Sequence, residues 1–238
     1  MIYHIAKTEA GSRLIKSVRE KADLGNLSER VERELRHRLM AGRFRPGQRL
    51  NIAELALGLG TSVTPIREAL FRLAAVHAVE FRRGYSVSVP VLSRARYLEI
   101  CEIRKANESL AASAAARHMG KDDIEQLEEI FRSYLDTKEG NDVQAALELN
   151  LRFRFFIYER AEMPILLQLI ENLWLLTGPQ FTNLYPLLPN SHQYEEEYAV
   201  AVAALRKGDG EGVANAIRKA IDVGTARLLP YFDMVERA

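Results

Sequence analysis

Two sets of side chains in this sequence are of types that could bind an anionic ligand. One is a group of hydroxyl and arginine side chains between residues 62 and 84, and the other is Arg154, which lies in an otherwise apolar stretch. A guanidinium binds a guanine edge, a phosphate or a carboxylate through paired hydrogen bonds, and a hydroxyl can reach a phosphate oxygen. These residue types predict binding to nucleic acid or to a small anion.

Residues that would carry out covalent chemistry do not form a recognisable pattern. The sequence has no glycine-rich phosphate loop, no nucleophile elbow and no cluster of metal ligands at a known spacing. Its single cysteine, Cys101, excludes an intramolecular disulfide, which fits a reducing compartment. We therefore expect a binding protein that is not an enzyme and that uses no cofactor.

The composition is that of an ordinary globular protein, but the charge is unevenly distributed. Residues 1–90 contain 16 Lys and Arg against nine Asp and Glu, whereas residues 91–238 contain 17 against 23. A basic first part predicts contact with a polyanion. No window approaches the roughly 20 apolar residues of a membrane span, and the first ten residues do not resemble a signal peptide. A cytoplasmic location is therefore expected.

The elements that would position the first set of residues are three helices followed by a hairpin. Apolar residues at a four-residue spacing predict a helix capped by Ser28 and ended by Gly42. A short helix is expected around residues 52–57. The third helix is predicted to begin with Thr64 as its N-cap and Pro65 at its first position.

After residue 78 the apolar pattern changes from helical to alternating. Val79 and Phe81 predict one strand, residues 82–84 a turn, and residues 85–89 a return strand. Three helices and a hairpin with a basic tip are typical of a winged helix-turn-helix. We therefore expect an N-terminal arm over residues 1–26 and a DNA-binding domain over residues 27–90.

From residue 93 onward only helical patterns are found, separated by glycine and proline. The expected helices run over about 93–118, 121–138, 142–160, 164–177, 192–207 and 210–232. The predicted fold class is mainly α, with an N-terminal winged helix-turn-helix and a C-terminal antiparallel all-helical bundle over residues 91–238.

Four strings follow one another in the first part of the chain: FRPGQRL at 44–50, ELA at 54–56, TSVTPIREAL at 61–70 and RGYSV at 83–87. Through these strings the sequence resembles the GntR family of bacterial regulators. The helical domain resembles the FadR C-terminal (FCD) type of that family. Its marks are EIR at 102–104 with Glu108, the aromatic helix around 153–158, and AL at 204–205 followed by GD at 208–209. The resemblance implies a homodimer joined largely through the helical domain, a pseudo-palindromic double-stranded DNA operator and a response to a small metabolite.

A recognition helix inserts its N-terminal residues into the major groove, so DNA contacts are expected just after residue 61. Arg67 is the candidate for base readout, because its guanidinium can bind a guanine edge bidentately. The alternative is that Arg67 pairs with a neighbouring glutamate. Ser62 and Thr64 are expected to contact phosphates, and Arg72 lies further along the outer side.

The hairpin tip and two further positions complete the expected DNA-binding surface. Arg82, Arg83 and Gly84 suit phosphate or minor-groove contact, and the alternative is that they are solvated turn residues. Many family members have a basic residue just before the Thr-Pro pair, where this sequence has Val63. Glu68 is expected to pair with an arginine of the protein, since DNA phosphates repel a carboxylate.

Many FCD proteins hold a metal ion with one Asp and three His on three helices of the bundle. Aligned on the family pattern, these four positions are Asn150, Arg154, Tyr198 and Ala220 here. None supplies the expected ligand, and a guanidinium would repel a divalent cation. We therefore expect no metal site.

Arg154 needs a partner, because its helix is apolar on nearly every side from residue 149 to 158. An unpaired buried charge costs several kcal/mol or more. The partner is either internal, with Glu108 or Glu102 as candidates, or an anionic effector, most simply a carboxylate. Arg104 is itself expected to pair with Glu108, four residues on. The candidate effector-binding residues are Arg104, Asn150, Arg154 and Tyr198.

Taken together, these features predict a sequence-specific DNA-binding transcriptional regulator, acting as a repressor, whose helical domain senses a small anionic metabolite. Two alternatives stay open, a constitutive DNA-binding dimer without an effector and a metal-dependent sensor of the FCD type. A polar-lined cavity in the bundle favours the sensor, and a dry, fully packed bundle favours the constitutive dimer.

Overall fold

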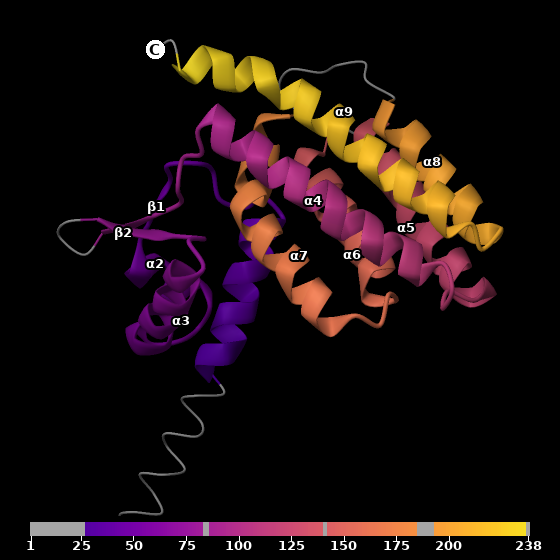
Figure 1. Ribbon diagram of the computed structural model, residues 1–238. Coiled ribbons are helices and arrows are strands. Elements are labelled where there is room, and N and C mark those ends of the chain that lie inside the picture. Colours follow the sequence, from indigo (N-terminus) through magenta and orange to yellow (C-terminus); the bar gives the residue numbers. More distant parts are fainter. Residues whose placement is uncertain (1–26, 83–85, 140–141, 185–192, 237–238) are drawn as a thin grey trace, which may run out of the picture. The chain divides into compact units, whose positions relative to one another are not determined.

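The computed structural model describes residues 27–82, 86–139, 142–184 and 193–236 (Figure 1). The described residues form two compact units. Residues up to 37 and residues 49–88 belong to the first unit, whereas residues 38–48 and the chain from residue 89 onward belong to the second. The first unit holds the expected DNA-contacting residues, and the second holds the expected effector-binding residues.

The helices of the first unit bury one apolar stripe each. The first helix spans residues 27–40, and its residues 27–37 belong to this unit. The other two are α2 (Ile52–Gly58) and α3 (Val63–Ala75). The Asn51 side chain caps α2 by accepting hydrogen bonds from two backbone N–H groups of the first turn. The buried apolar side chains of the three helices are Val31, Leu35, Leu55, Ala56, Ile66, Ala69, Leu70 and Leu73.

The first turn of α3 differs from the prediction. The N-cap is Ser62, with extended backbone at φ −82° and ψ 168°, so the helix begins at Val63, two residues earlier than expected. Pro65 is tolerated at the third position because the first N–H groups of a helix have no intrahelical acceptor. Ser28, predicted as the cap of the first helix, lies within that helix and is buried. Both predicted caps were wrong.

The wing is part of a three-stranded antiparallel sheet with the order β1-β3-β2. The strands are β1 (Arg49–Leu50), β2 (Glu80–Arg82) and β3 (Ser86–Ser88). Val87 at the centre of β3 pairs with one residue of each neighbour and is buried. Strand β1 was not predicted, because two residues are too few to show an alternating pattern.

The second unit is a helical bundle. Its elements are α4 (Arg94–Ala115), α5 (Lys121–Glu139), α6 (Val143–Glu159), α7 (Pro164–Thr177), the 3₁₀ segment η2 (Gly178–Asn183), α8 (Gln193–Arg206) and α9 (Gly210–Glu236). Ser93 and Asp142 cap α4 and α6 through side-chain hydrogen bonds to the first turn. Gly208, at φ +64°, makes the turn between α8 and α9. These helices agree closely with the ranges expected from the sequence.

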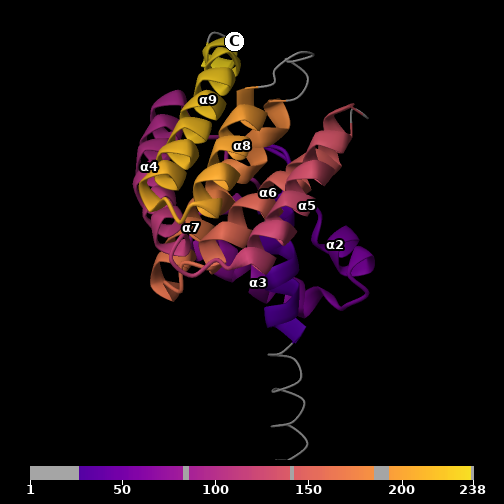
Figure 2. The ribbon, with the colours of Figure 1, turned by 90° about the vertical axis from the view of Figure 1, so that its right-hand side faces the viewer.

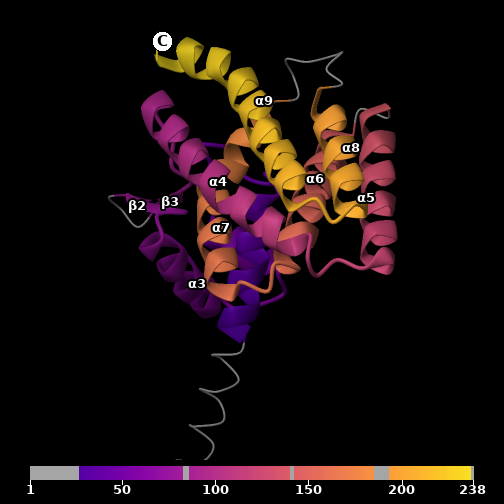
Figure 3. The same ribbon diagram turned by 45° about the vertical axis from the view of Figure 1, so that its right-hand side comes forward.

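The most extensive helix–helix contact of the bundle is between α4 and α9. Helix α4 packs against α9, α6 and α7, and α8 packs against α9 and α5 (Figures 2 and 3). A hydrophobic core that includes Phe153, Ile157 and Trp174 fills the space between the helices. Gly178 allows close approach of η2 to residues 39–40, since a Cβ there would lie 2.5 Å from the Leu39 carbonyl oxygen. The predicted fold class is confirmed.

Within the described ranges, no helix is both long enough and apolar enough for a membrane-spanning segment.

Candidate functional site

The N-terminal end of α3 presents the predicted DNA-contacting side chains to solvent. Ser62, Thr64 and Arg67 are all exposed, whereas Ile66 and Leu70 are completely buried. Arg67 forms no ion pair with any described residue, so its guanidinium donors are available to a ligand. A base edge in the major groove is a ligand of this kind.

One flank of α3 is held by the helix of residues 27–40. Glu68 accepts a hydrogen bond from the Ser28 hydroxyl, and Arg72 Nε lies 2.5 Å from Glu32 Oε2. The expected arginine partner of Glu68 was therefore wrong, because the hydroxyl of the neighbouring helix is closer. Arg72 already has a carboxylate partner, which leaves the flank of Arg67 as the freer side of α3.

The wing carries a further arginine next to a carboxylate. Arg82 donates to Glu80 Oε1 from Nε at 2.8 Å and from Nη2 at 2.5 Å, and Ser88 Oγ donates to the same oxygen at 3.1 Å. The Arg82 side chain is nevertheless 60% exposed, so it can exchange this partner for a phosphate. Arg83 and Gly84, the other predicted wing contacts, lie outside the described residues.

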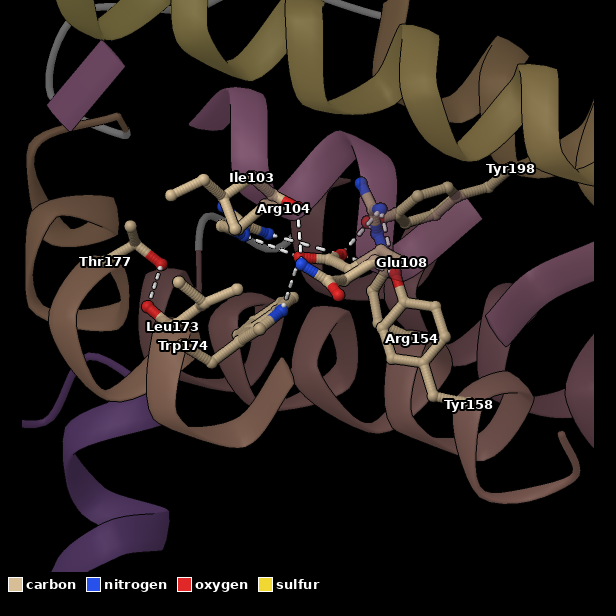
Figure 4. Close-up of polar contacts among 10 residues, drawn as sticks. Ile103, Arg104, Glu108, Arg154, Tyr158, Leu173, Trp174, Thr177 and Tyr198 are labelled. Atoms are coloured by element: carbon tan, nitrogen blue, oxygen red, sulfur yellow. Dashed lines mark hydrogen bonds and ion pairs between the residues drawn. The ribbon is translucent and has the colours of Figure 1, made fainter. Parts of the chain in front are cut away.

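In the helical unit, the buried carboxylate of Glu108 on α4 accepts hydrogen bonds from two other helices, α6 and α7, and from its own (Figure 4). Its Oε1 accepts from Arg104 Nε at 2.6 Å and from Trp174 Nε1 at 3.0 Å. Its Oε2 accepts from the Tyr158 hydroxyl at 2.5 Å, with Arg154 Nη1 at 3.5 Å. No part of Glu108 is exposed, so these donors replace the water that would solvate the carboxylate.

Arg154 extends this network towards α8. Its Nε donates to the Tyr198 hydroxyl at 3.0 Å and its Nη1 to the Tyr158 hydroxyl at 3.2 Å. The Tyr198 hydroxyl in turn donates to Asn150 Oδ1. Arg154 and Tyr198 are buried, whereas Asn150 is half-buried, so the Asn150 end of the network is the end nearer to solvent. We call Arg104, Glu108, Asn150, Arg154, Tyr158, Trp174 and Tyr198 the arginine cluster.

The charges of the arginine cluster do not balance. Burial by itself lowers the pKa of Arg104, but the Glu108 carboxylate, together with Cys101 and Tyr97, outweighs it and leaves the pKa above the ordinary value. Burial by itself also lowers the pKa of Arg154. The oxygens of Tyr198, Tyr158 and Glu108 outweigh this effect and leave the pKa well above its ordinary value. Burial, and then Glu108, raises the pKa of Tyr158 well above its usual range, so this hydroxyl stays protonated and can donate. Two guanidiniums and one carboxylate give the cluster a net charge of +1.

The structure brings the four predicted effector-binding residues into one network. Asn150, Tyr198 and Arg154 are hydrogen-bonded in series, and Arg104 joins them through Glu108. The expected Arg104–Glu108 pair is confirmed. The sequence reasoning missed the hydrogen bonds of Tyr158 and Trp174. Tyr158 stands four residues after Arg154 on one helix and could have been found by that spacing, whereas Trp174 lies on another helix and gives no local signal.

The four positions aligned with the family's metal ligands do not carry side chains that would bind a metal ion. Asn150, Arg154 and Tyr198 satisfy one another, and Ala220 is buried and contributes no side-chain donor. Among the described residues, no group of three or more His, Cys, Asp or Glu side chains could hold a metal ion. The absence of a metal requirement stays a prediction, which elemental analysis of the purified chain tests.

Comparison with known proteins identifies both units. Residues 27–89 match the model of bacterial regulatory proteins of the gntR family, and residues 99–223 match the FCD domain. The HTH-type transcriptional regulator McbR of Escherichia coli K12 is 33% identical over 210 residues, covering 87% of this chain and 95% of McbR. The solved structure of McbR matches with a TM-score of 0.82, covering 87% of this chain and 98% of that one.

Two further similarities agree with this result. A probable D-xylose utilization operon transcriptional repressor of Paenarthrobacter nicotinovorans is 28% identical, covering 74% of this chain and 77% of that protein. A solved regulator from Rhodococcus sp. RHA1 has a TM-score of 0.68 at 19% identity, covering 85% of this chain and 97% of that one, and supports the fold alone. The chain therefore belongs to the gntR family of bacterial transcriptional regulators, with an N-terminal DNA-binding domain and a C-terminal FCD domain.

Proposed function

We propose that this regulator is a repressor that binds a pseudo-palindromic operator as a homodimer and responds to a small carboxylate held by the arginine cluster. The observation that carries the effector part is the excess positive charge of a cluster that is almost fully buried. Desolvating a second guanidinium without a second carboxylate is unfavourable, and a bound anion would offset that cost.

The DNA-binding part rests on the exposed end of α3. Arg67 is proposed to read a guanine, while Ser62, Thr64 and the wing residues Arg82, Arg83 and Gly84 position the domain on phosphates or in the minor groove. Arg72 is proposed as a weaker contact, because it would have to leave Glu32 to reach DNA.

The test of the DNA-binding part compares Arg67→Ala with the wild type on the promoter duplex of its own gene and on a scrambled duplex. Loss of a bidentate contact should cost about 1–3 kcal/mol on the promoter and little on the scrambled duplex. Affinity is measured by fluorescence anisotropy at fixed salt, since phosphate contacts make it depend on salt. Unchanged promoter binding by Arg67→Ala would contradict the assignment.

The homodimer is proposed to form through an apolar face on α4 and α7, which pack side by side (Figure 1). Ile103, Leu110, Ile165 and Leu169 on these helices are 43–79% exposed. An apolar face of this kind can pair with its own copy about a two-fold axis. The two DNA-binding domains of such a dimer would then meet two half-sites of one operator.

The carboxylate is proposed to bind at the Asn150 end of the arginine cluster, which is the end nearer to solvent. Arg154 would give the carboxylate guanidinium donors that it now gives to the hydroxyls of Tyr198 and Tyr158, and Tyr198 and Asn150 would provide further polar contacts. Arg104 keeps its bond to Glu108 and adds positive potential behind the site. The net charge of +1 favours a ligand with one carboxylate at this position.

The test of the effector part is a thermal-shift screen of small carboxylates and sugar acids, followed by calorimetry on the wild type and Arg154→Met. Any ligand that binds only the native state raises the melting temperature. Arg154→Met removes the excess charge and should abolish binding, whereas Arg152→Met, an exposed arginine on the same helix, should leave it unchanged. Equal binding by Arg154→Met would make Arg154 a structural ion-pair partner and favour the constitutive dimer.

A further inference from the structure

Val63 is an apolar side chain at a position where the DNA-binding surface is otherwise polar. It is the first residue of α3 and 38% exposed, between the exposed residues Ser62 and Thr64. A valine cannot form hydrogen bonds with a base or a phosphate. In the major groove, the one apolar group that a base presents is the C5-methyl of thymine.

We infer that Val63 selects a thymine in the operator by contact with its methyl group, an inference that rests on the proposed role of α3 in DNA binding. Val63 and Arg67 are four residues apart and therefore lie on the same flank of the helix. Glu68 and Arg72 lie on the other flank, where Ser28 and Glu32 hold them. Val63 thus shares the side of α3 that is free to meet bases.

The spacing of Val63 and Arg67 fixes which bases they can reach. Four residues of α-helix rise about 6 Å, whereas successive bases of a strand are about 3.4 Å apart. A groove-bound α3 therefore places the two side chains over bases that are one or two pairs apart. The thymine selected by Val63 should lie within about two base pairs of the guanine read by Arg67.

The experiment removes the methyl group from the DNA and the side chain from the protein in turn. A duplex is first selected from a random pool by the full-length chain, and each thymine is then replaced singly by deoxyuridine, which lacks only the C5-methyl. Binding is measured by fluorescence anisotropy at constant salt. The wild type should bind one such duplex about fourfold more weakly, the value expected for losing one buried methyl-sized group. Val63→Ala should bind the thymine and deoxyuridine duplexes equally well.

Two variants serve as matched controls. Thr64→Ser removes the methyl group of the neighbouring exposed residue and keeps its hydroxyl, so it should still discriminate thymine from deoxyuridine. Leu57→Ala truncates an 84% exposed leucine on α2 and should also leave the discrimination intact. Both substitutions are at exposed positions and should not disturb folding.

The inference is overturned if no deoxyuridine position weakens wild-type binding, or if Val63→Ala shows the same discrimination as the wild type. Loss of discrimination in Thr64→Ser with retention in Val63→Ala would also overturn it and assign the contact to Thr64. If the chain selects no duplex at all, the proposed function fails, and this outcome is distinct from selection without methyl discrimination.

Discussion

At the scale of single residues, Glu108 is the position on which the buried polar network depends. Its carboxylate is the shared acceptor for Arg104, Trp174, Tyr158 and Arg154. Removing a carboxylate that compensates buried guanidiniums is costly, whereas replacing one surplus guanidinium by an apolar side chain is not. Removing the carboxylate should therefore destabilise the protein far more than removing the surplus guanidinium.

Glu108→Gln is expected to lower the free energy of unfolding by about 3–5 kcal/mol, because it leaves two buried guanidiniums without a carboxylate. Arg154→Met should cost much less, since Glu108 still pairs with Arg104. The measurement is urea unfolding followed by circular dichroism and by the fluorescence of Trp174, the chain's single tryptophan. Glu102→Gln, a 71% exposed carboxylate on the same helix, is the control and should change stability by less than about 0.5 kcal/mol. A near-neutral Glu108→Gln would mean that the charges are compensated in some other way.

The residues of the arginine cluster could be predicted only in part. The Arg104–Glu108 pair follows from a four-residue spacing on one helix, and Arg154 was recognisable as a charge within an apolar segment. The hydrogen bond from Trp174 to Glu108 joins α7 to α4, and no local pattern reports such a partner. Residues that meet across a bundle are set by packing, which sequence spacing does not record.

At the scale of elements, prolines and glycines made most helix boundaries of the bundle predictable. α7 begins at Pro164 as expected, and Gly208 separates α8 from α9. The prediction was less accurate at the start of α3, where Thr64 was expected as the N-cap and Ser62, two residues earlier, takes that position. It also missed β1, whose pairing with β3 is a tertiary interaction of a two-residue segment.

The apolar face of α4 and α7 gives a prediction about assembly. Leu110→Glu places a charge on this face and should convert the proposed dimer to a monomer, because an unpaired charge in an interface is poorly tolerated. Val200→Glu, which changes a similarly exposed residue on α8, should leave the dimer intact. Sedimentation or light scattering gives the mass of each variant. A Leu110→Glu variant that remains a dimer would exclude this face as the interface.

At the scale of the whole molecule, DNA binding and the proposed effector binding belong to two separate units. The first presents Arg67 at the exposed end of α3, and the second encloses a cluster with one uncompensated positive charge. To regulate, an effector must bind the DNA-competent and DNA-incompetent arrangements with different affinities. By the same linkage, bound operator must change the affinity for the effector.

The direct test is a titration of the chain on its labelled operator duplex, with and without a carboxylate that raises the melting temperature of the wild type. Chloride at equal ionic strength is the control, because salt alone weakens DNA binding. The carboxylate should lower the operator affinity of the wild type about 5- to 150-fold, the usual range of allosteric coupling. It should have no effect on Arg154→Met, whose operator affinity itself is retained. An unchanged wild-type affinity, or an equal response of Arg154→Met, would contradict this prediction.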